Sequence, residues 1–81
     1  TELNSILRNQ YRVTDSTRGL LIYKVKKNSK AVDIGFSSGD VIVQINNNEV
    51  DTIQEFKRAV RSNEKNRYYI YRKGMLLIHV L

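Results

Sequence analysis

The 81-residue sequence contains no cysteine, no proline and no tryptophan, and histidine occurs once. Without cysteine the chain can form neither a disulfide nor a thiolate metal site. A serine-hydrolase triad requires a histidine between a nucleophile and a carboxylate, but His79 stands in an alternating terminal segment between Ile78 and Val80. Metal-ligand spacings and glycine-rich phosphate loops are also missing. We therefore expect no enzyme in this chain by itself, and no catalytic residue, metal ion or cofactor.

Long apolar runs and a leader segment are missing as well. No run approaches the roughly 20 residues that cross a bilayer, and no charged leader followed by an apolar segment opens the chain. A chain of this length buries only about 60% of the surface that its unfolded form exposes. We therefore expect one domain with a single small core, excised or matured from a longer protein.

Charge is distributed unevenly along the chain. The formal net charge is +6, and the segment from Lys57 to Lys73 contains Glu64 as its one acid. Its basic residues are Lys57, Arg58, Arg61, Lys65, Arg67, Arg72 and Lys73. Such a segment is either a solvated surface or a patch for acidic peptides, phospholipid or nucleic acid. Tyr69 and Tyr71 either stack on bases or pack across a hairpin.

The stretch from Arg18 to Asn46 has the clearest structural pattern. Two aliphatic runs have the length of buried strands, Leu20–Val25 and Val41–Ile45. Between them, Ser29 can cap a short helix that stops at Gly35. Asp40, which follows a glycine, can accept backbone amides within the turn that leads into the second strand.

The flanking segments predict two further helices and a hairpin. Leu3, Ile6 and Leu7 follow helical spacing within residues 1–10. Thr52 and Glu55 form a capping box, so we expect a helix from residue 53 to about residue 62. The chain then forms a hairpin around Lys73-Gly74. On its second strand, we expect the core-facing side chains to be Leu76, Ile78 and Val80.

The order of these signals resembles a known family. These are a glycine before an aliphatic strand, then Ser29-x-Ala31, Gly35-Phe36, Gly39-Asp40-Val41-Ile42 and Ile45-Asn46. In the order of these motifs, the chain resembles a bacterial PDZ domain of the Deg/HtrA serine proteases. The resemblance covers residues 5–81, with Lys30 in place of the usual proline and Asn48 or a neighbour in place of a glycine.

This resemblance implies an α+β fold. The expected architecture is a small, partly open β-barrel or sandwich of about five to six strands, capped by two helices, in the bacterial, circularly permuted strand order. Residues 1–81 would form a single PDZ domain, with residues 1–18 as an N-terminal helix and lead-in segment.

The resemblance also implies a peptide-binding site. An extended peptide would add to the strand that begins at Leu20, and Gly19 matches the glycine of a loop that binds a terminal carboxylate. Gly19 can equally be an ordinary turn glycine. Across from the strand, Ile53 would read a peptide side chain, unless it simply packs inward. The predicted binding residues are Arg18, Gly19, Leu20, Leu21, Ile22, Tyr23, Ile53, Lys57, Val60 and Arg61.

The resemblance implies a peptide-binding module, the C-terminal PDZ domain, of a trypsin-like serine endopeptidase in the bacterial periplasm or envelope. Its partners would be hydrophobic C-termini or unfolded segments, together with the protease and other PDZ domains of a homo-oligomeric parent. We expect no nucleic acid partner. Two alternatives stay open: the PDZ domain of a site-2 metalloprotease, tail-specific protease or secretion component, and a small basic domain that binds nucleic acid or membranes.

Overall fold

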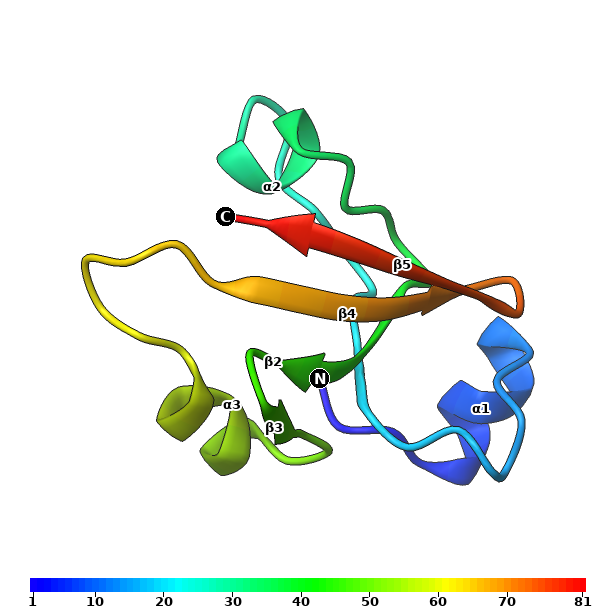
Figure 1. The fold of residues 1–81 in the computed structure, drawn as a ribbon. Helices are drawn as coiled ribbons and strands as arrows, with labels where there is room; N and C mark the ends of the chain where they lie inside the picture. The colour runs from blue at the N-terminus through cyan, green and yellow to red at the C-terminus, as the bar shows by residue number, and fades with distance from the viewer.

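The computed structural model describes residues 1–81 as an open antiparallel sheet with three short helices around it (Figure 1). In chain order the elements are α1 (Ser5–Tyr11), β1 (Leu20–Leu21), α2 (Lys30–Asp33), β2 (Val41–Ile45), β3 (Asn48–Glu49), α3 (Ile53–Ala59), β4 (Arg67–Arg72) and β5 (Met75–Val80). This architecture confirms the predicted α+β class and the predicted number of strands. None of the helices has the length and apolar character needed to cross a bilayer.

Side-chain caps begin all three helices. Asn4 Oδ1 accepts the Leu7 N–H at the start of α1, and Ser29 caps α2 as predicted. At α3, Thr52 Oγ1 accepts the Glu55 N–H while the Glu55 carboxylate accepts the Thr52 N–H. This reciprocal pair is the predicted capping box and satisfies donors that the first helical turn leaves free.

Two of the helices differ from their predicted form. The third, α3, ends at Ala59 and not near residue 62, because Val60 adopts extended backbone angles (φ −74°, ψ 128°). The first, α1, buries none of its residues, and Ile6 is 74% exposed. The predicted apolar stripe of α1 is therefore only half-buried, through Leu3 and Leu7.

The sheet has the order β1-β2-β4-β5, and β3 pairs with β2 beside β1. The central strand β2 therefore contacts three other strands, as its apolar sequence predicts. The first strand is shorter than the predicted Leu20–Val25. Its partner chain turns at Gly39 (φ +95°), so that no strand lies opposite the residues after Ile22.

The core contains eight buried side chains, which come from β1, β2, β4, α3 and two loop positions. These are Leu20, Phe36, Ile42, Ile45, Val50, Ala59, Tyr68 and Ile70. Beside this core, Asp40 is 1% exposed and pairs with Arg72, with 2.8 Å between Oδ1 and Nε. Asp40 also accepts the Ser37 N–H, as predicted for this turn. The ion pair joins the turn before β2 to the end of β4.

The predicted core face of β5 is wrong. Arg72 pairs with Met75 across a two-residue turn at Lys73-Gly74, whose φ angles are both positive. This turn places Leu77 opposite the buried Ile70, and directly opposed residues share a face of the sheet. The residues predicted to face the core are instead 53%, 54% and 50% exposed: Leu76, Ile78 and Val80.

The single histidine lies on the inner face of β5. Its ring packs edge-on against Phe36, with 5.1 Å between the ring centres. His79 Nε2 lies 3.2 Å from the Gly35 carbonyl oxygen. These contacts explain the residue as part of the packing between β5 and the segment after α2.

Candidate functional site

Strand β1 is paired along both of its edges. On one edge, Leu20 and Leu21 pair with β2. On the other edge, Leu21 and Thr1 exchange two backbone hydrogen bonds of 2.7 Å each, and Glu2 lies opposite Leu20. This pairing contradicts the predicted use of Leu20 and Leu21 as the strand that receives a peptide, because their backbone groups already have partners.

The two residues that follow β1 are also held by the fold. The Ile22 N–H donates to the Asp40 carbonyl, and the Ile22 carbonyl accepts the Gly39 N–H. The Tyr23 carbonyl accepts the Ser38 hydroxyl, while the Tyr23 side chain is 58% exposed. Of the predicted strand residues, only the Tyr23 side chain is therefore presented to solvent.

Gly19 is buried against β2. A Cβ atom at this position would overlap the Ile42 carbonyl oxygen and lie 2.7 Å from Val41 Cγ1. The glycine therefore permits the close approach of two strands, which is a packing role and needs no carboxylate.

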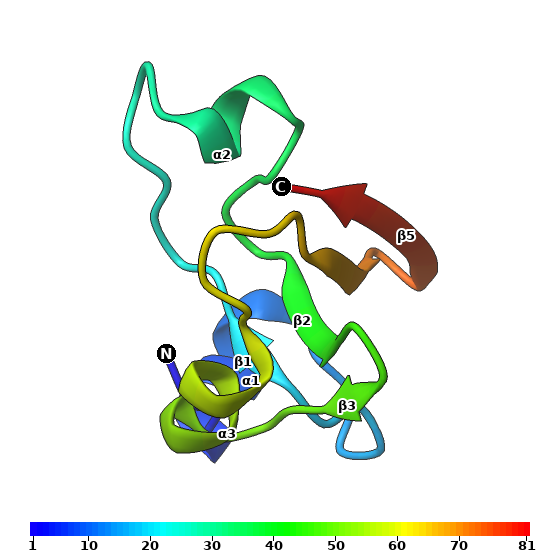
Figure 2. The ribbon, with the colours of Figure 1, turned by 60° about the vertical axis from the view of Figure 1, so that its left-hand side comes forward.

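The backbone of Thr1–Leu3 carries the free edge on this side of the sheet. Because Thr1 exchanges both of its hydrogen bonds with Leu21, the antiparallel geometry directs the N–H and C=O of Glu2 away from β1. Neither group has a hydrogen-bond partner in the fold. We call this the N-terminal edge. The Glu2 carboxylate accepts the Ile53 N–H at 3.1 Å, which places the segment beside the start of α3 (Figure 2).

The predicted residues of the helix side lie at both ends of α3. Ile53 is the first helical residue and is 40% exposed, so it is not simply packed inward. Lys57 is exposed on the same helix. Val60 is half-buried against the core, and the exposed Arg61 lies 3.9 Å from Glu64. Because α3 ends at Ala59, Val60 and Arg61 do not continue the helical stripe that the sequence predicts.

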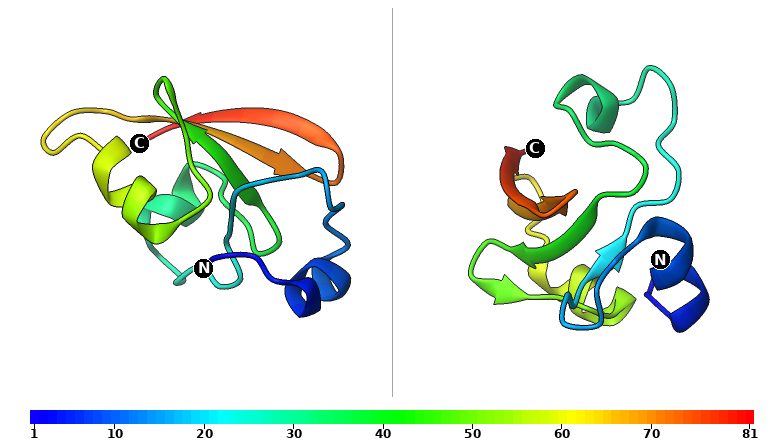
Figure 3. Two further views of the ribbon diagram at one scale, coloured as in Figure 1. Left: turned by 90° about the horizontal axis from the view of Figure 1, so that it is seen from below. Right: turned by 90° about the vertical axis from the view of Figure 1, so that its right-hand side faces the viewer.

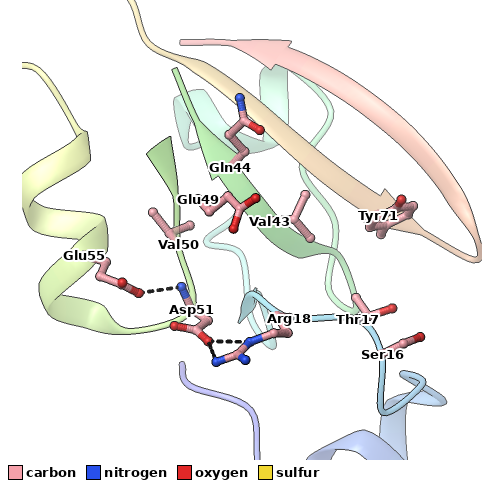
Figure 4. A pocket seen from close by; sticks show the side chains of 10 residues that line it. All are labelled: Ser16, Thr17, Arg18, Val43, Gln44, Glu49, Val50, Asp51, Glu55 and Tyr71. Atoms are coloured by element: carbon pink, nitrogen blue, oxygen red, sulfur yellow. Dashed lines mark hydrogen bonds and ion pairs between the residues drawn. The ribbon is translucent and has the colours of Figure 1, made fainter. Parts of the chain in front are cut away.

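Arg18 lies in a separate polar pocket of about 570 Å³. Its guanidinium donates twice to one oxygen of Asp51, at 2.6 and 2.9 Å (Figure 4). Glu55 accepts the Asp51 N–H in turn. The hydrogen bonds from Arg18 lower the pKa of Asp51, and the same contact raises the pKa of Arg18. Arg18 thus fastens the loop before β1 to the loop before α3.

Sequence reasoning therefore named residues of α3, which lies beside the N-terminal edge, but it did not name the segment Thr1–Leu3. The segment Thr1–Leu3 is too short to show a strand period, and the prediction assigned it to a helix. The signal that could have found it is Asn4, whose capping side chain ends the extended segment and starts α1.

A family model of the PDZ domain matches residues 11–77. The chain belongs to the PDZ domain family. This PDZ domain is 30% identical over 73 residues to the mitochondrial serine protease HTRA2 of Drosophila erecta, a match that covers 90% of the chain and 17% of the relative. It is 36% identical over 64 residues to a probable periplasmic DegP-like serine endoprotease of Brucella suis biovar 1 (strain 1330), covering 79% of the chain and 12% of the relative.

The fold of this PDZ domain is also similar to a solved structure of the HtrA-type protease AlgW. The two superpose with a TM-score of 0.81 at 20% identity, over 99% of this chain and 25% of the other. The PDZ domain thus spans a quarter or less of each of these relatives. The comparisons confirm the predicted family and its likeness to HtrA-type proteases.

Proposed function

We propose that this PDZ domain is the peptide-binding module of an HtrA-type serine protease. Hydrophobic C-termini or extended segments add as a strand at the N-terminal edge, beside α3. The observation that carries the proposal is the unpaired N–H and C=O of Glu2, next to a helix that starts with the exposed Ile53. The AlgW structure, which has the same fold, is described with a decapeptide, and strand addition is a general mode of PDZ recognition.

The side chains around this edge favour apolar peptides. Ile53 offers an aliphatic side chain and no hydrogen-bonding group, and Leu3, the residue after Glu2, is half-buried. Lys57 adds a positive charge one helical turn further along α3. Apolar residues near the start of α3, followed by an acidic residue, are therefore the preferred ligand pattern.

The expected affinity of the 81-residue chain is low. One residue with two outward backbone groups supplies two hydrogen bonds, or about 1–3 kcal/mol in total. A millimolar complex requires about 4 kcal/mol, so the contact with Ile53 must supply the remainder. We therefore expect a Kd on the order of millimolar.

The same relatives support a proposal about the parent protein. A DegP-like parent would place the domain in the periplasm of a bacterium, next to a trypsin-like protease domain and in a homo-oligomer. In such a parent the domain would report peptide occupancy to the protease or contribute to assembly. The similarity to HtrA-type proteases favours this parent over a site-2 metalloprotease, a tail-specific protease or a secretion component.

An NMR titration tests the proposal. The ¹⁵N-labelled chain is titrated with an acetylated octapeptide of alternating serine and valine, in free-acid and amidated forms. We expect saturable shifts at Glu2, Leu3 and Ile53, and a weaker response in Ile53→Ser. Ile6→Ser makes the same substitution at an exposed position on α1 and should respond like the wild type.

The outcome of this titration distinguishes the alternatives. Shifts that avoid both Glu2 and α3 would contradict strand addition at the N-terminal edge. Equal shifts with both peptide forms would remove the free carboxylate from the recognition mechanism. Tight, steeply salt-dependent binding to single-stranded nucleic acid or anionic vesicles would instead favour the basic-domain alternative.

A further inference from the structure

The outer face of the β4–β5 hairpin is apolar and uncovered. We define this outer hairpin face by Tyr69, Tyr71, Leu76, Ile78 and Val80. Tyr69 pairs with Ile78 and Tyr71 with Leu76, while Val80 pairs with Arg67 at the end of the same face. All but the half-buried Tyr69 are exposed. In the left view of Figure 3, β5 (red) runs along the upper rim of the ribbon and the helices lie below it. Contiguous apolar surfaces of this kind mark interaction sites in soluble proteins.

The edge of β5 that points away from β4 has backbone groups without hydrogen-bond partners. Asn66 and Leu81 exchange two hydrogen bonds, and β4 is the only strand that pairs with β5. The antiparallel alternation therefore turns the N–H and C=O of Leu76, Ile78 and Val80 away from β4. No other residue bonds to these groups. We call these three residues the β5 edge. Each of them presents unpaired backbone groups and an exposed apolar side chain.

The β5 edge lacks the usual protection of an edge strand. Natural edges carry lysine, proline or a bulge that prevents pairing with another chain. Strand β5 has the sequence MLLIHV and is paired with β4 without a register shift. Its one polar side chain, His79, packs inward against Phe36. An extended segment can therefore pair with β5 along its whole length.

The charges around this edge are mostly positive, with Asp33 on α2 and Glu64 as the nearby acids. From residue 65 to the end the sequence contains no acid. Arg72 is paired with Asp40, but Lys65, Arg67 and Lys73 are exposed and form no ion pair. The acids of β3 and α3 lie beyond β2, on the far side of the sheet. A second copy of this chain, also with net charge +6, would bring like charges together.

From these observations we infer that β5 is a second docking strand, which pairs with an extended acidic segment of another polypeptide that has apolar residues at alternate positions. The apolar side chains of the segment would continue the outer hairpin face, and its acids would be favoured by the positive charge of Lys65, Arg67 and Lys73 around this edge. This site lies at the opposite end of the sheet from the N-terminal edge and does not depend on it.

The test uses an acetylated and amidated heptapeptide of alternating glutamate and valine. Because both ends are blocked, no terminal carboxylate contributes to binding. Titrated into the ¹⁵N-labelled chain, the peptide should shift the amides of Leu76, Ile78 and Val80 saturably. The same peptide with lysine in place of glutamate should bind at least about tenfold more weakly, since its lysines would be repelled by the basic residues around the edge.

Variants separate backbone pairing from charge. Ile78→Pro removes an N–H that faces away from β4, so the β4–β5 ladder keeps its hydrogen bonds. It should weaken binding by about tenfold, as expected for the loss of one hydrogen bond and its apolar contact. Ile78→Thr keeps strand propensity and removes apolar surface, so it serves if the proline variant fails to fold. Arg67→Glu should weaken binding, whereas Arg58→Glu, the same change on α3, should not.

Three outcomes would overturn the inference. The first is a set of shifts confined to Glu2 and α3. The second is equal binding of the lysine and glutamate peptides. The third is sedimentation showing a dimer of the chain that Ile78→Pro dissociates, because the occupant of β5 would then be a second copy.

Discussion

Gly19→Ala separates a packing role from a binding role for this glycine. If Gly19 belonged to a carboxylate-binding loop, the variant would fold normally and lose peptide affinity. In the structure, the new methyl group would overlap the Ile42 carbonyl oxygen and lie 2.7 Å from Val41 Cγ1. A backbone oxygen cannot rotate away, so β1 must move from β2 and loosen the buried Leu20 and Leu21.

The expected cost follows from the size of this overlap. Overpacking a core usually costs about 1–3 kcal/mol, and a backbone obstacle places this variant near about 3 kcal/mol. The free energy of unfolding of a domain is about 5–15 kcal/mol in total. Each kcal/mol of lost stability lowers the Tm of a small domain by about 4–8 °C. The Tm should therefore fall by more than about 10 °C.

Urea unfolding measures the loss in free energy of unfolding. It is followed by far-UV circular dichroism, because the chain has no tryptophan whose fluorescence could report unfolding. Gly74→Ala is the matched control: its added Cβ meets nothing within 4 Å. That variant should lose only the cost of a positive φ, about 1–2 kcal/mol. A Gly19→Ala chain as stable as the wild type would refute the packing argument and restore the loop as a candidate ligand site.

Three further substitutions test the contacts that hold the fold. Asp40→Ala removes the buried partner of Arg72 and the acceptor of the Ser37 N–H, and should cost about 3 kcal/mol in urea unfolding; a loss below about 1 kcal/mol would show that Arg72 rehydrates freely. Thr52→Ala breaks the capping box and should cost about 1 kcal/mol, while Thr14→Ala, in an exposed loop, should cost less. The pKa of Asp51 is lowered in the folded chain, so its contribution to stability is present above the unfolded value of 3.8 and is lost as pH falls through the folded value. Arg18→Ala should reduce this acid sensitivity, and an unchanged pH profile would contradict the assignment.

Local chemistry made much of the fold predictable. Ser29 and the pair Thr52 and Glu55 start their helices because each side chain satisfies backbone donors within its own turn. The hairpin turn at Lys73-Gly74 is also determined locally, since glycine accepts the positive φ that a two-residue turn requires. These features depend on a few neighbouring residues, so the sequence order is sufficient to predict them.

Nonlocal pairing was the part that sequence order could not supply. The run Met75–Ile78 is apolar throughout, so no alternation indicates which residues face the core, and the hairpin register alone decides it. In the same way, Thr1 occupies the edge of β1 across a separation of 20 residues. The sequence therefore predicted β1 as the strand that receives a peptide, whereas the free edge belongs to the neighbouring segment Thr1–Leu3.

The two proposed docking strands lie at opposite ends of one sheet, in the order Thr1–Leu3, β1, β2, β4, β5. They share no residue and differ in chemistry, since Ile53 and Glu2 border one edge while Arg67 and Lys73 border the other. Distant sites without shared partners usually contribute independently. Saturating the chain with the glutamate peptide should therefore leave the affinity for the neutral serine-valine peptide at Glu2 unchanged. Competition at Glu2 would mean that both peptides use one edge, and the assignment to β5 would then fail while strand addition beside α3 would stand.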